Sequence, residues 1–196
     1  GFGDGVGTLA NKRGLLSGSV LWSVREHTRL CLSPYAQLPG NPCGGSCLPK
    51  DVRGRTHEGR ISGEELPLLE SLLPSNEAHL AKLIELIKRL AKDRVTLLGL
   101  SFKSDTDDLR ESPMVEVAQH LLGRGFELSI YDPQLNLAKL IGTNKRVIDE
   151  KMPHLATLLT GDLAAALGQS GLVIAAQKCI DLETLRPLIT TEHTLL

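Results

Sequence analysis

Val95-Thr96-Leu97-Leu98-Gly99-Leu100 is the short apolar run that decides the fold. An uninterrupted run of this kind is typical of a strand that is buried on both faces of a parallel sheet. Two further strands are expected at residues 127–132 and 171–176, and a stretch with helical apolar spacing, residues 114–122, separates the first strand from the second. This alternation predicts an α/β fold with a doubly wound parallel sheet.

A polar loop, residues 101–112, follows the first predicted strand. Ligands of doubly wound sheets bind beyond the carboxyl ends of the strands, where this loop is expected. Lys103 could place its charge on a phosphate or sugar oxygen, and Arg110 could grip a phosphate with two hydrogen bonds. Alternatively, the loop is solvated and its charges pair with one another. Ser112 is expected to cap the helix that follows.

Asp132 ends the second predicted strand. A carboxylate at this position suits a ribose hydroxyl, but it could equally cap the following turn. The sequence leaves both readings open.

The region before the first strand is expected to be helical. Apolar residues at helical spacing predict one good helix, and they are Leu80, Leu83, Ile84, Ile87 and Leu90. This apolar stripe would either pack in a core or form a subunit interface. Residues 66–73 predict a separate helix that Pro67 and Pro74 limit. Residues 52–63 are interpreted as a loop or frayed helix, followed by a capping box from Ser62 to Glu65.

A second motif, Cys-Gly-Gly-Ser-Cys-Leu-Pro-Lys-Asp, occupies residues 43–51. Gly44 and Gly45 let the backbone turn sharply and approach a ligand closely. Pro49 suits the first turn of a helix, where its missing N–H is not needed. Cys47 would then lie beside a helix N-terminus.

The expected surroundings of Cys47 favour the thiolate, which is the reactive form. The helix dipole and the nearby cation of Lys50 both stabilise a negative sulfur. Asp51 is close enough in sequence to act on a water molecule or to orient a neighbour. These features suit a covalent nucleophile, although a small buried cysteine in a glycine turn fits the nine residues equally well.

The composition restricts the class of partner. The formal net charge is −1 and aromatic residues make up 3% of the chain, so neither nucleic acid nor an anionic membrane is an expected partner. The spacing of the four cysteines fits neither a disulfide framework nor a zinc ribbon, so no metal site is expected. A reducing cytoplasm is the expected location.

Both motifs resemble one family, the UDP-glucose/GDP-mannose dehydrogenases, which are nucleotide-sugar 6-dehydrogenases. Residues 44–53 look like the family's catalytic cysteine motif, and residues 98–113 look like the opening of its C-terminal nucleotide-binding domain. The order and separation of the two motifs also fit. Residues 32–34, 151–154 and 161–163 most resemble the members that oxidise GDP-mannose, and the members that oxidise UDP-glucose are near relatives.

The resemblance implies a domain organisation. Residues 1–92 would be part of a central helical dimerisation region that carries the cysteine loop. Residues 93–196 would be a Rossmann-like nucleotide-sugar-binding domain, cut short at its end. The family's N-terminal NAD-binding domain is expected to be absent from this chain, which would therefore not turn over by itself. A homodimer through the central helices is also implied.

The resemblance further implies a reaction and the residues that perform it. The C6 alcohol of GDP-mannose is oxidised twice with two NAD molecules, through a thiohemiacetal and a thioester on Cys47, and Asp51 assists the water that releases the uronate. Arg110 would contact NAD across a domain interface. The residues implied in substrate binding are Gly44, Gly45, Lys50, Phe102 and Lys103. The alternatives are a UDP-sugar 6-dehydrogenase and a non-catalytic module for nucleotide-sugar binding or dimerisation.

Overall fold

The computed structural model describes residues 41–45, 47–101, 108–135, 146, 150, 153–168, 170–176 and 180–196. The chain forms two compact units, Gly1–Leu83 and Ile84–Leu196, and the division falls within one long helix. Phe102 and Lys103, two of the predicted substrate-binding residues, lie outside the described residues.

The second unit is built on a parallel sheet with the strand order β2-β1-β3-β4. Its strands are β1 (Arg94–Leu98), β2 (Glu127–Tyr131), β3 (Leu172–Ala175) and β4 (Thr194–Leu195). Each neighbouring pair is parallel, and Val95 of β1 lies opposite Leu128 of β2 and Leu172 of β3. The predicted parallel α/β fold is confirmed, and the three predicted strands are its three longer strands.

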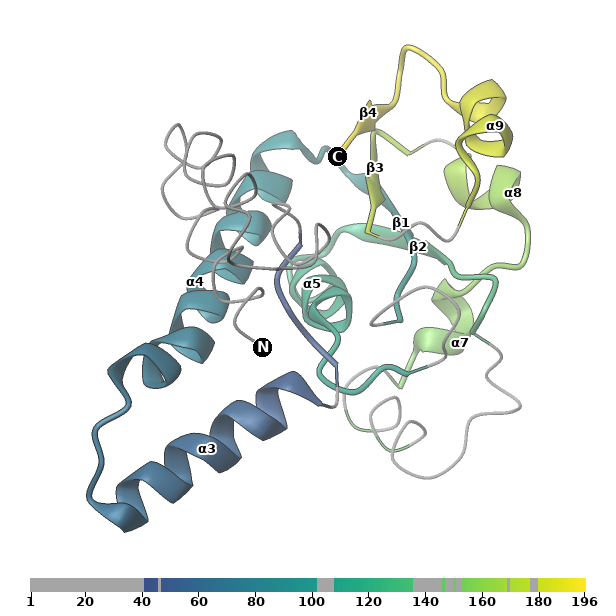
Figure 1. Ribbon diagram of the computed structural model, residues 1–196. Helices are drawn as coiled ribbons and strands as arrows, with labels where there is room; N and C mark the ends of the chain where they lie inside the picture. The colour runs from purple at the N-terminus through teal and green to yellow at the C-terminus, as the bar shows by residue number, and fades with distance from the viewer. Residues whose placement is uncertain are drawn as a thin grey trace, which may run out of the picture. The chain divides into compact units, whose positions relative to one another are not determined.

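Helices cover both faces of this sheet. Figure 1 shows α5 (Pro113–Leu122) on one side of the strands, and α7 (Leu155–Leu158), α8 (Leu163–Leu167) and α9 (Leu182–Leu185) on the other. A short 3-10 turn, η4 (Arg186–Leu188), follows α9. Residues 95–98 of β1 are all buried, as a central strand covered on both faces requires.

The cysteine motif opens α3 (Leu48–Ser62), and Pro49 lies in its first turn, as predicted. The helix continues to Ser62, so the interpretation of residues 52–63 as a loop or frayed helix is wrong. It ends where Gly63 adopts a left-handed φ of 73° and the Glu64 N–H donates to the Gly59 carbonyl at 2.9 Å. Because Ser62 is the last helical residue, the predicted capping box from Ser62 to Glu65 is also wrong.

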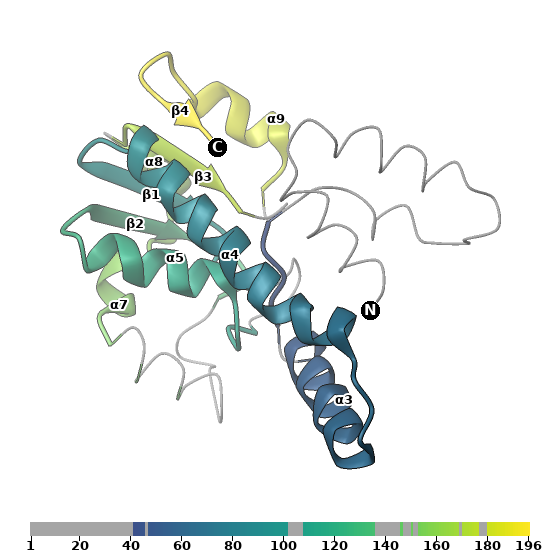
Figure 2. The ribbon, with the colours of Figure 1, turned by 90° about the vertical axis from the view of Figure 1, so that its left-hand side faces the viewer.

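A single helix, α4 (Pro67–Leu90), replaces the two helices expected before the sheet (Figure 2). Pro67 is its first residue, where proline is tolerated, and Pro74 lies in its interior. Within the second unit, the predicted stripe is buried at Ile84 and Ile87, which are 7% and 0% exposed. Burial of this face outweighs one unfavourable proline, which costs about 3 kcal/mol. Leu90, at the helix end, is 37% exposed, so the stripe does not extend that far.

Candidate functional site

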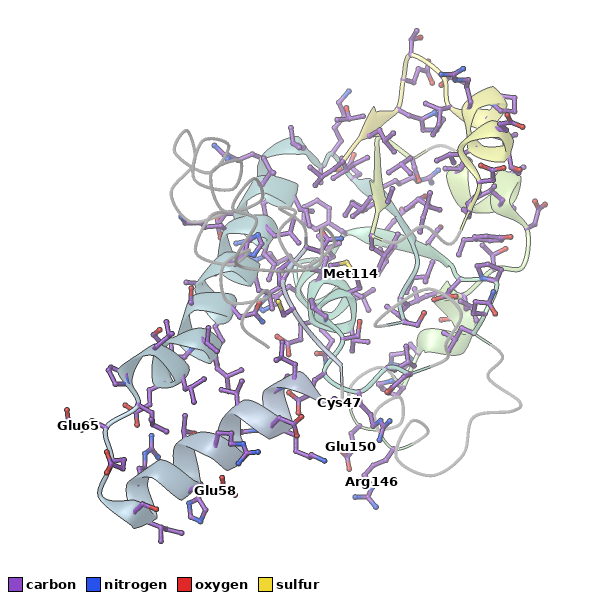
Figure 3. The ribbon with its side chains drawn as sticks, in the orientation of Figure 1. Cys47, Glu58, Glu65, Met114, Arg146 and Glu150 are labelled. Atoms are coloured by element: carbon purple, nitrogen blue, oxygen red, sulfur yellow. The ribbon has the colours of Figure 1, made fainter. Side chains whose placement is uncertain are left out.

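Cys47 lies at the N-cap of α3, directly after the glycine turn (Figure 3). Its backbone is helical, with φ −92° and ψ −60°, and its carbonyl accepts a hydrogen bond from the Asp51 N–H at 2.9 Å. Cys47 is an exposed cysteine, which contradicts the buried-cysteine alternative. The first-turn N–H groups of α3 and the thiol therefore share one helix end, where the dipole favours negative charge.

Lys50 and Asp51 are both exposed in the first turn of α3. They follow Cys47 by three and four residues, and residues at these spacings share one face of a helix. The spacing therefore places the positions of Cys47, Lys50 and Asp51 on one face of the helix start. Their roles in catalysis and substrate binding remain predictions.

The glycines that precede Cys47 are buried, unlike the thiol itself. Gly44 and Gly45 are both buried, and Gly45 has a φ of 88°, a conformation that glycine adopts readily. The loop is tied to α4 by Asn76, whose Oδ1 accepts a hydrogen bond from the Cys43 N–H at 2.7 Å and whose Nδ2 donates to the Cys43 carbonyl at 2.8 Å. Sequence analysis missed Asn76, because no local pattern joins residues 33 positions apart.

In the second unit, the Asp132 carboxylate accepts hydrogen bonds from Leu100 and Ser101, which follow β1. Its Oδ2 accepts hydrogen bonds from the Leu100 N–H at 2.9 Å and from the Ser101 N–H and hydroxyl at 3.0 Å, and its Oδ1 accepts one from the Gln134 N–H at 3.0 Å. The carboxylate is 5% exposed, and a carboxylate offers about four acceptor sites. Protein groups make four hydrogen bonds to it, so the prediction that Asp132 caps the following turn is confirmed, and the carboxylate also holds the loop after β1; the ribose interpretation stays a prediction.

The far end of the same loop is tied to β1 by Ser112. Its hydroxyl donates to the Leu100 carbonyl at 2.7 Å, so the expected side-chain cap on α5 is wrong, although Ser112 does occupy the N-cap position. Glu111, one residue earlier, has a φ of 50°, which is uncommon for a residue other than glycine. The loop therefore leaves and re-enters the sheet edge at one point, next to Leu100.

Arg110 is held by a carboxylate of its own loop. Its Nε donates to Asp108 Oδ1 at 2.8 Å and its Nη2 to Asp108 Oδ2 at 2.9 Å, and its backbone N–H also donates to Oδ1 at 3.0 Å. The Arg110 side chain is 43% exposed and that of Asp108 is 16% exposed. The alternative in which the loop charges pair with one another is correct for these two residues, although the Arg110 side chain as a whole remains partly exposed.

The structure therefore brings Gly44, Gly45, Cys47, Lys50 and Asp51 together on one loop and helix start. Arg110 belongs to the second unit. Within the part of the chain that the structure describes, no group of three or more His, Cys, Asp or Glu side chains could hold a metal ion. In that same part, no helix is both long and apolar enough to cross a membrane.

Comparisons with known proteins agree with the fold and with both motifs. Residues 96–183 match the UDP binding domain of the UDP-glucose/GDP-mannose dehydrogenase family. The GDP-mannose 6-dehydrogenase of Pseudomonas putida is 41% identical over 177 residues, which are 90% of this chain and 40% of that protein. This chain therefore spans about two fifths of the length of the curated relatives it matches.

Solved structures are similar over the whole chain. A ternary complex of GDP-mannose dehydrogenase from Pseudomonas aeruginosa is 38% identical with a TM-score of 0.74, over 99% of this chain and 44% of that one. A UDP-glucose dehydrogenase from the archaeon Pyrobaculum islandicum is 28% identical with a TM-score of 0.73, over 100% of this chain and 43% of that one. The chain belongs to the UDP-glucose/GDP-mannose dehydrogenase family.

Proposed function

We propose that this chain is the cysteine-bearing portion of an NAD-dependent GDP-mannose 6-dehydrogenase. The observation that carries the proposal is the exposed Cys47 thiol at the N-cap of α3, with Lys50 and Asp51 on the same helix face. The identity to GDP-mannose 6-dehydrogenases over 90% of the chain supports the same function.

The proposed role of Cys47 is to capture the aldehyde that the first oxidation produces at C6 of the sugar. Its sulfur adds to C6, and the carbonyl oxygen takes up the proton that the thiol gives up, which forms a thiohemiacetal. After the second oxidation the sulfur is part of a thioester. Asp51 orients the water that attacks this thioester, and the thiol leaves as the uronate forms.

NAD would supply the oxidising chemistry by accepting a hydride from C6 in each oxidation. Arg110 would contact NAD, because its partly exposed side chain carries a cation that suits a pyrophosphate. Asp108 holds this guanidinium by two hydrogen bonds and thereby sets its orientation.

The proposed substrate is GDP-mannose. Gly44, Gly45 and Lys50 would contact it from the cysteine loop, and Phe102 and Lys103 from the loop that follows β1. A UDP-sugar is the alternative, since residues 96–183 match a UDP binding domain and the similar archaeal structure is a UDP-glucose dehydrogenase. A homodimer through the helices of residues 1–92 belongs to the same proposal, because the family resemblance implies it. A cytoplasmic location is also proposed, because the cysteine spacing fits no disulfide framework.

Cysteine alkylation tests the proposal on this chain directly. Each of the four thiols is followed by mass spectrometry during reaction with iodoacetamide at neutral pH, with and without GDP-mannose or UDP-glucose. Cys47 is expected to react about tenfold faster than Cys31 and Cys179. GDP-mannose is expected to slow its reaction at concentrations where UDP-glucose has little effect.

Two results would contradict the proposal in different ways. Equal alkylation rates for Cys47, Cys31 and Cys179, together with GDP-mannose binding, would favour a non-catalytic binding module. Stronger protection by UDP-glucose than by GDP-mannose would favour the UDP-sugar alternative. The Cys47→Ala variant controls for effects of either nucleotide sugar on the other three thiols.

A further inference from the structure

We propose that Asn76 of α4 is a positioning residue for the Cys47 nucleophile. Its carboxamide binds both the N–H and the carbonyl of Cys43, at 2.7 and 2.8 Å, four residues before Cys47. The inference rests on the proposed function of Cys47, because a positioning role has meaning only if this thiol reacts.

The chemistry of the contact requires a carboxamide. Asn offers one acceptor and two donors on a short, rigid group, so it can pair with a peptide unit as a neighbouring strand would. The partners also fix its orientation, since Oδ1 must face the Cys43 N–H and Nδ2 must face the Cys43 carbonyl. Asp would retain the acceptor but would place a second oxygen against that carbonyl. Ala would remove both hydrogen bonds.

The short segment between Cys43, which Asn76 binds, and Cys47 needs such a restraint. Gly44 and Gly45 give this segment more backbone freedom than other residues would, and ordering one residue costs about 1–2 kcal/mol. On the helix side, Cys47 is held by the hydrogen bond from the Asp51 N–H to its carbonyl. Asn76 holds the other side, so the short segment that carries the thiol is restrained at both ends.

Burial supports the view that this contact is maintained. Pro42, Gly44 and Gly45 are buried and Cys43 is half-buried, whereas Cys47 is exposed. The loop is therefore packed up to the residues before the thiol, and the thiol itself projects where a substrate can reach it. The half-buried Asn76 forms its bonds with little competition from water, which strengthens them.

Capture of an aldehyde measures whether the thiol is correctly placed. The probe is GDP-mannose whose C6 alcohol has been oxidised to the aldehyde, which forms the thiohemiacetal with Cys47 without NAD. Its affinity is measured by protection of Cys47 from iodoacetamide and is compared with the affinity for GDP-mannose. The variants are Asn76→Asp and Asn76→Ala. The control is Ser71→Ala, which removes a polar group of α4 that bonds to its own helix at the Leu68 carbonyl.

Both Asn76 variants are expected to lose about tenfold or more in aldehyde affinity, because covalent addition depends steeply on position. Their affinity for GDP-mannose should fall about threefold or less, since addition to C6 is not part of that equilibrium. Ser71→Ala should match the wild type in both measurements. A merely structural role of Asn76 would lower both affinities equally or neither, and that result would overturn the inference.

A second measurement, which needs no reaction of the thiol, separates failure of this inference from failure of the proposed function. A nitroxide is attached to Cys47 in a chain whose other three cysteines are replaced by Ala, and its mobility is measured by electron paramagnetic resonance. Asn76→Asp, which is nearly isosteric and expected to fold, should increase the mobility, while Ser71→Ala should not. Failure of the wild-type chain to capture the aldehyde at Cys47 would refute the proposed function. An unchanged nitroxide mobility in Asn76→Asp would refute the role of Asn76.

Discussion

Asp132 and Ser101 join the carboxyl ends of β2 and β1 through one carboxylate oxygen, which accepts hydrogen bonds from both the backbone N–H and the hydroxyl of Ser101 at 3.0 Å. The Leu100 N–H donates to the same oxygen at 2.9 Å. Parallel strands end at the same edge of a sheet, so a buried carboxylate on one strand can hold the loop that leaves its neighbour. Asp132 thus fixes the root of the loop that carries Arg110.

Asp132→Ala is expected to lower the free energy of unfolding by about 3 kcal/mol, because it leaves buried N–H groups without an acceptor. Asp162→Ala is the matched control. Asp162 also accepts a hydrogen bond from a backbone N–H, that of Ala164 at 2.9 Å, but it is exposed at the N-cap of α8. Its loss should cost about 1 kcal/mol. Urea unfolding measures both values, and equal losses would show that burial does not strengthen the Asp132 contacts.

Two glycines of α3 should respond in opposite directions to alanine. A Cβ added at Gly54 would meet no atom within 4 Å, so Gly54→Ala should raise the free energy of unfolding by about 0.5–1 kcal/mol through helix propensity. At Gly59 a Cβ would lie 2.5 Å from Leu66 Cδ1 and 3.2 Å from the Glu64 carbonyl oxygen. Gly59→Ala should therefore lower the free energy of unfolding by about 1 kcal/mol.

Urea unfolding of the two α3 variants provides the comparison. Since both substitutions make the same chemical change within one helix, the difference between them isolates the packing of Gly59 against the turn after α3. A Gly59→Ala chain as stable as Gly54→Ala would show that this close approach is absent.

Pro74 should destabilise α4, because it lies in the helix interior, where proline lacks the N–H and its ring crowds the carbonyl four residues earlier. Pro74→Ala is expected to raise the free energy of unfolding by about 1–2 kcal/mol, after the greater freedom of the unfolded chain is taken into account. Pro67→Ala, at the first helical residue, should change it by about 0.5 kcal/mol or less. Thermal unfolding of both variants tests this, and a lower Tm for Pro74→Ala would refute it.

His79 should make stability depend on pH. Burial, and secondly the positive charge of Lys82, lower the pKa of His79 below its usual value of 6.5. Below pH 6.5 the unfolded chain therefore takes up a proton that the folded chain resists. The contribution of His79 to stability is complete above pH 6.5 and is lost as the pH falls through 6.5 toward the folded pKa, by at most about 1.4 kcal/mol per pH unit.

The matching experiment compares urea unfolding at about pH 7.5 and about pH 5.5, on either side of the ordinary histidine pKa. His79→Gln is expected to reduce the loss of stability between these two values. Within the described part of the chain, His79 Nδ1 is buried without a hydrogen-bond partner, so a proton added there would have no acceptor. An identical pH dependence in His79→Gln and the wild type would rule His79 out as its source.

Much of the fold could be predicted because its signals are local. The run from Val95 to Leu100 predicts a doubly covered strand, and Pro49 predicts the start of a helix. Both predictions are confirmed. The predictions that failed at Ser62 and Pro74 also relied on local rules, but there the balance was set by the face of α4 that is buried at Ile84 and Ile87 and by the glycine that ends α3.

The candidate site was predictable only in part. The residue types of the cysteine motif and its position at a helix start follow from nine consecutive residues. The partners of that motif and of the polar loop do not, because Asn76 and Asp132 act on backbone groups 31–33 residues away. Asp108 lies only two residues from Arg110, and this spacing was a usable signal for the ion pair.

The sequence by itself determined which segments form buried strands, which helix carries the thiol and which family the motifs resemble, since periodicity and short motifs express the preferences of neighbouring residues. Only the tertiary structure decided that Asp132 holds the loop after β1, that Asn76 binds Cys43, and that Pro74 stays within a continuous helix. The first two depend on which distant backbone groups are brought within about 3 Å, and hydrogen bonds over long sequence separations leave no periodic trace in the chain. The third depends on burial of the helix face, which outweighs the local preference of one residue.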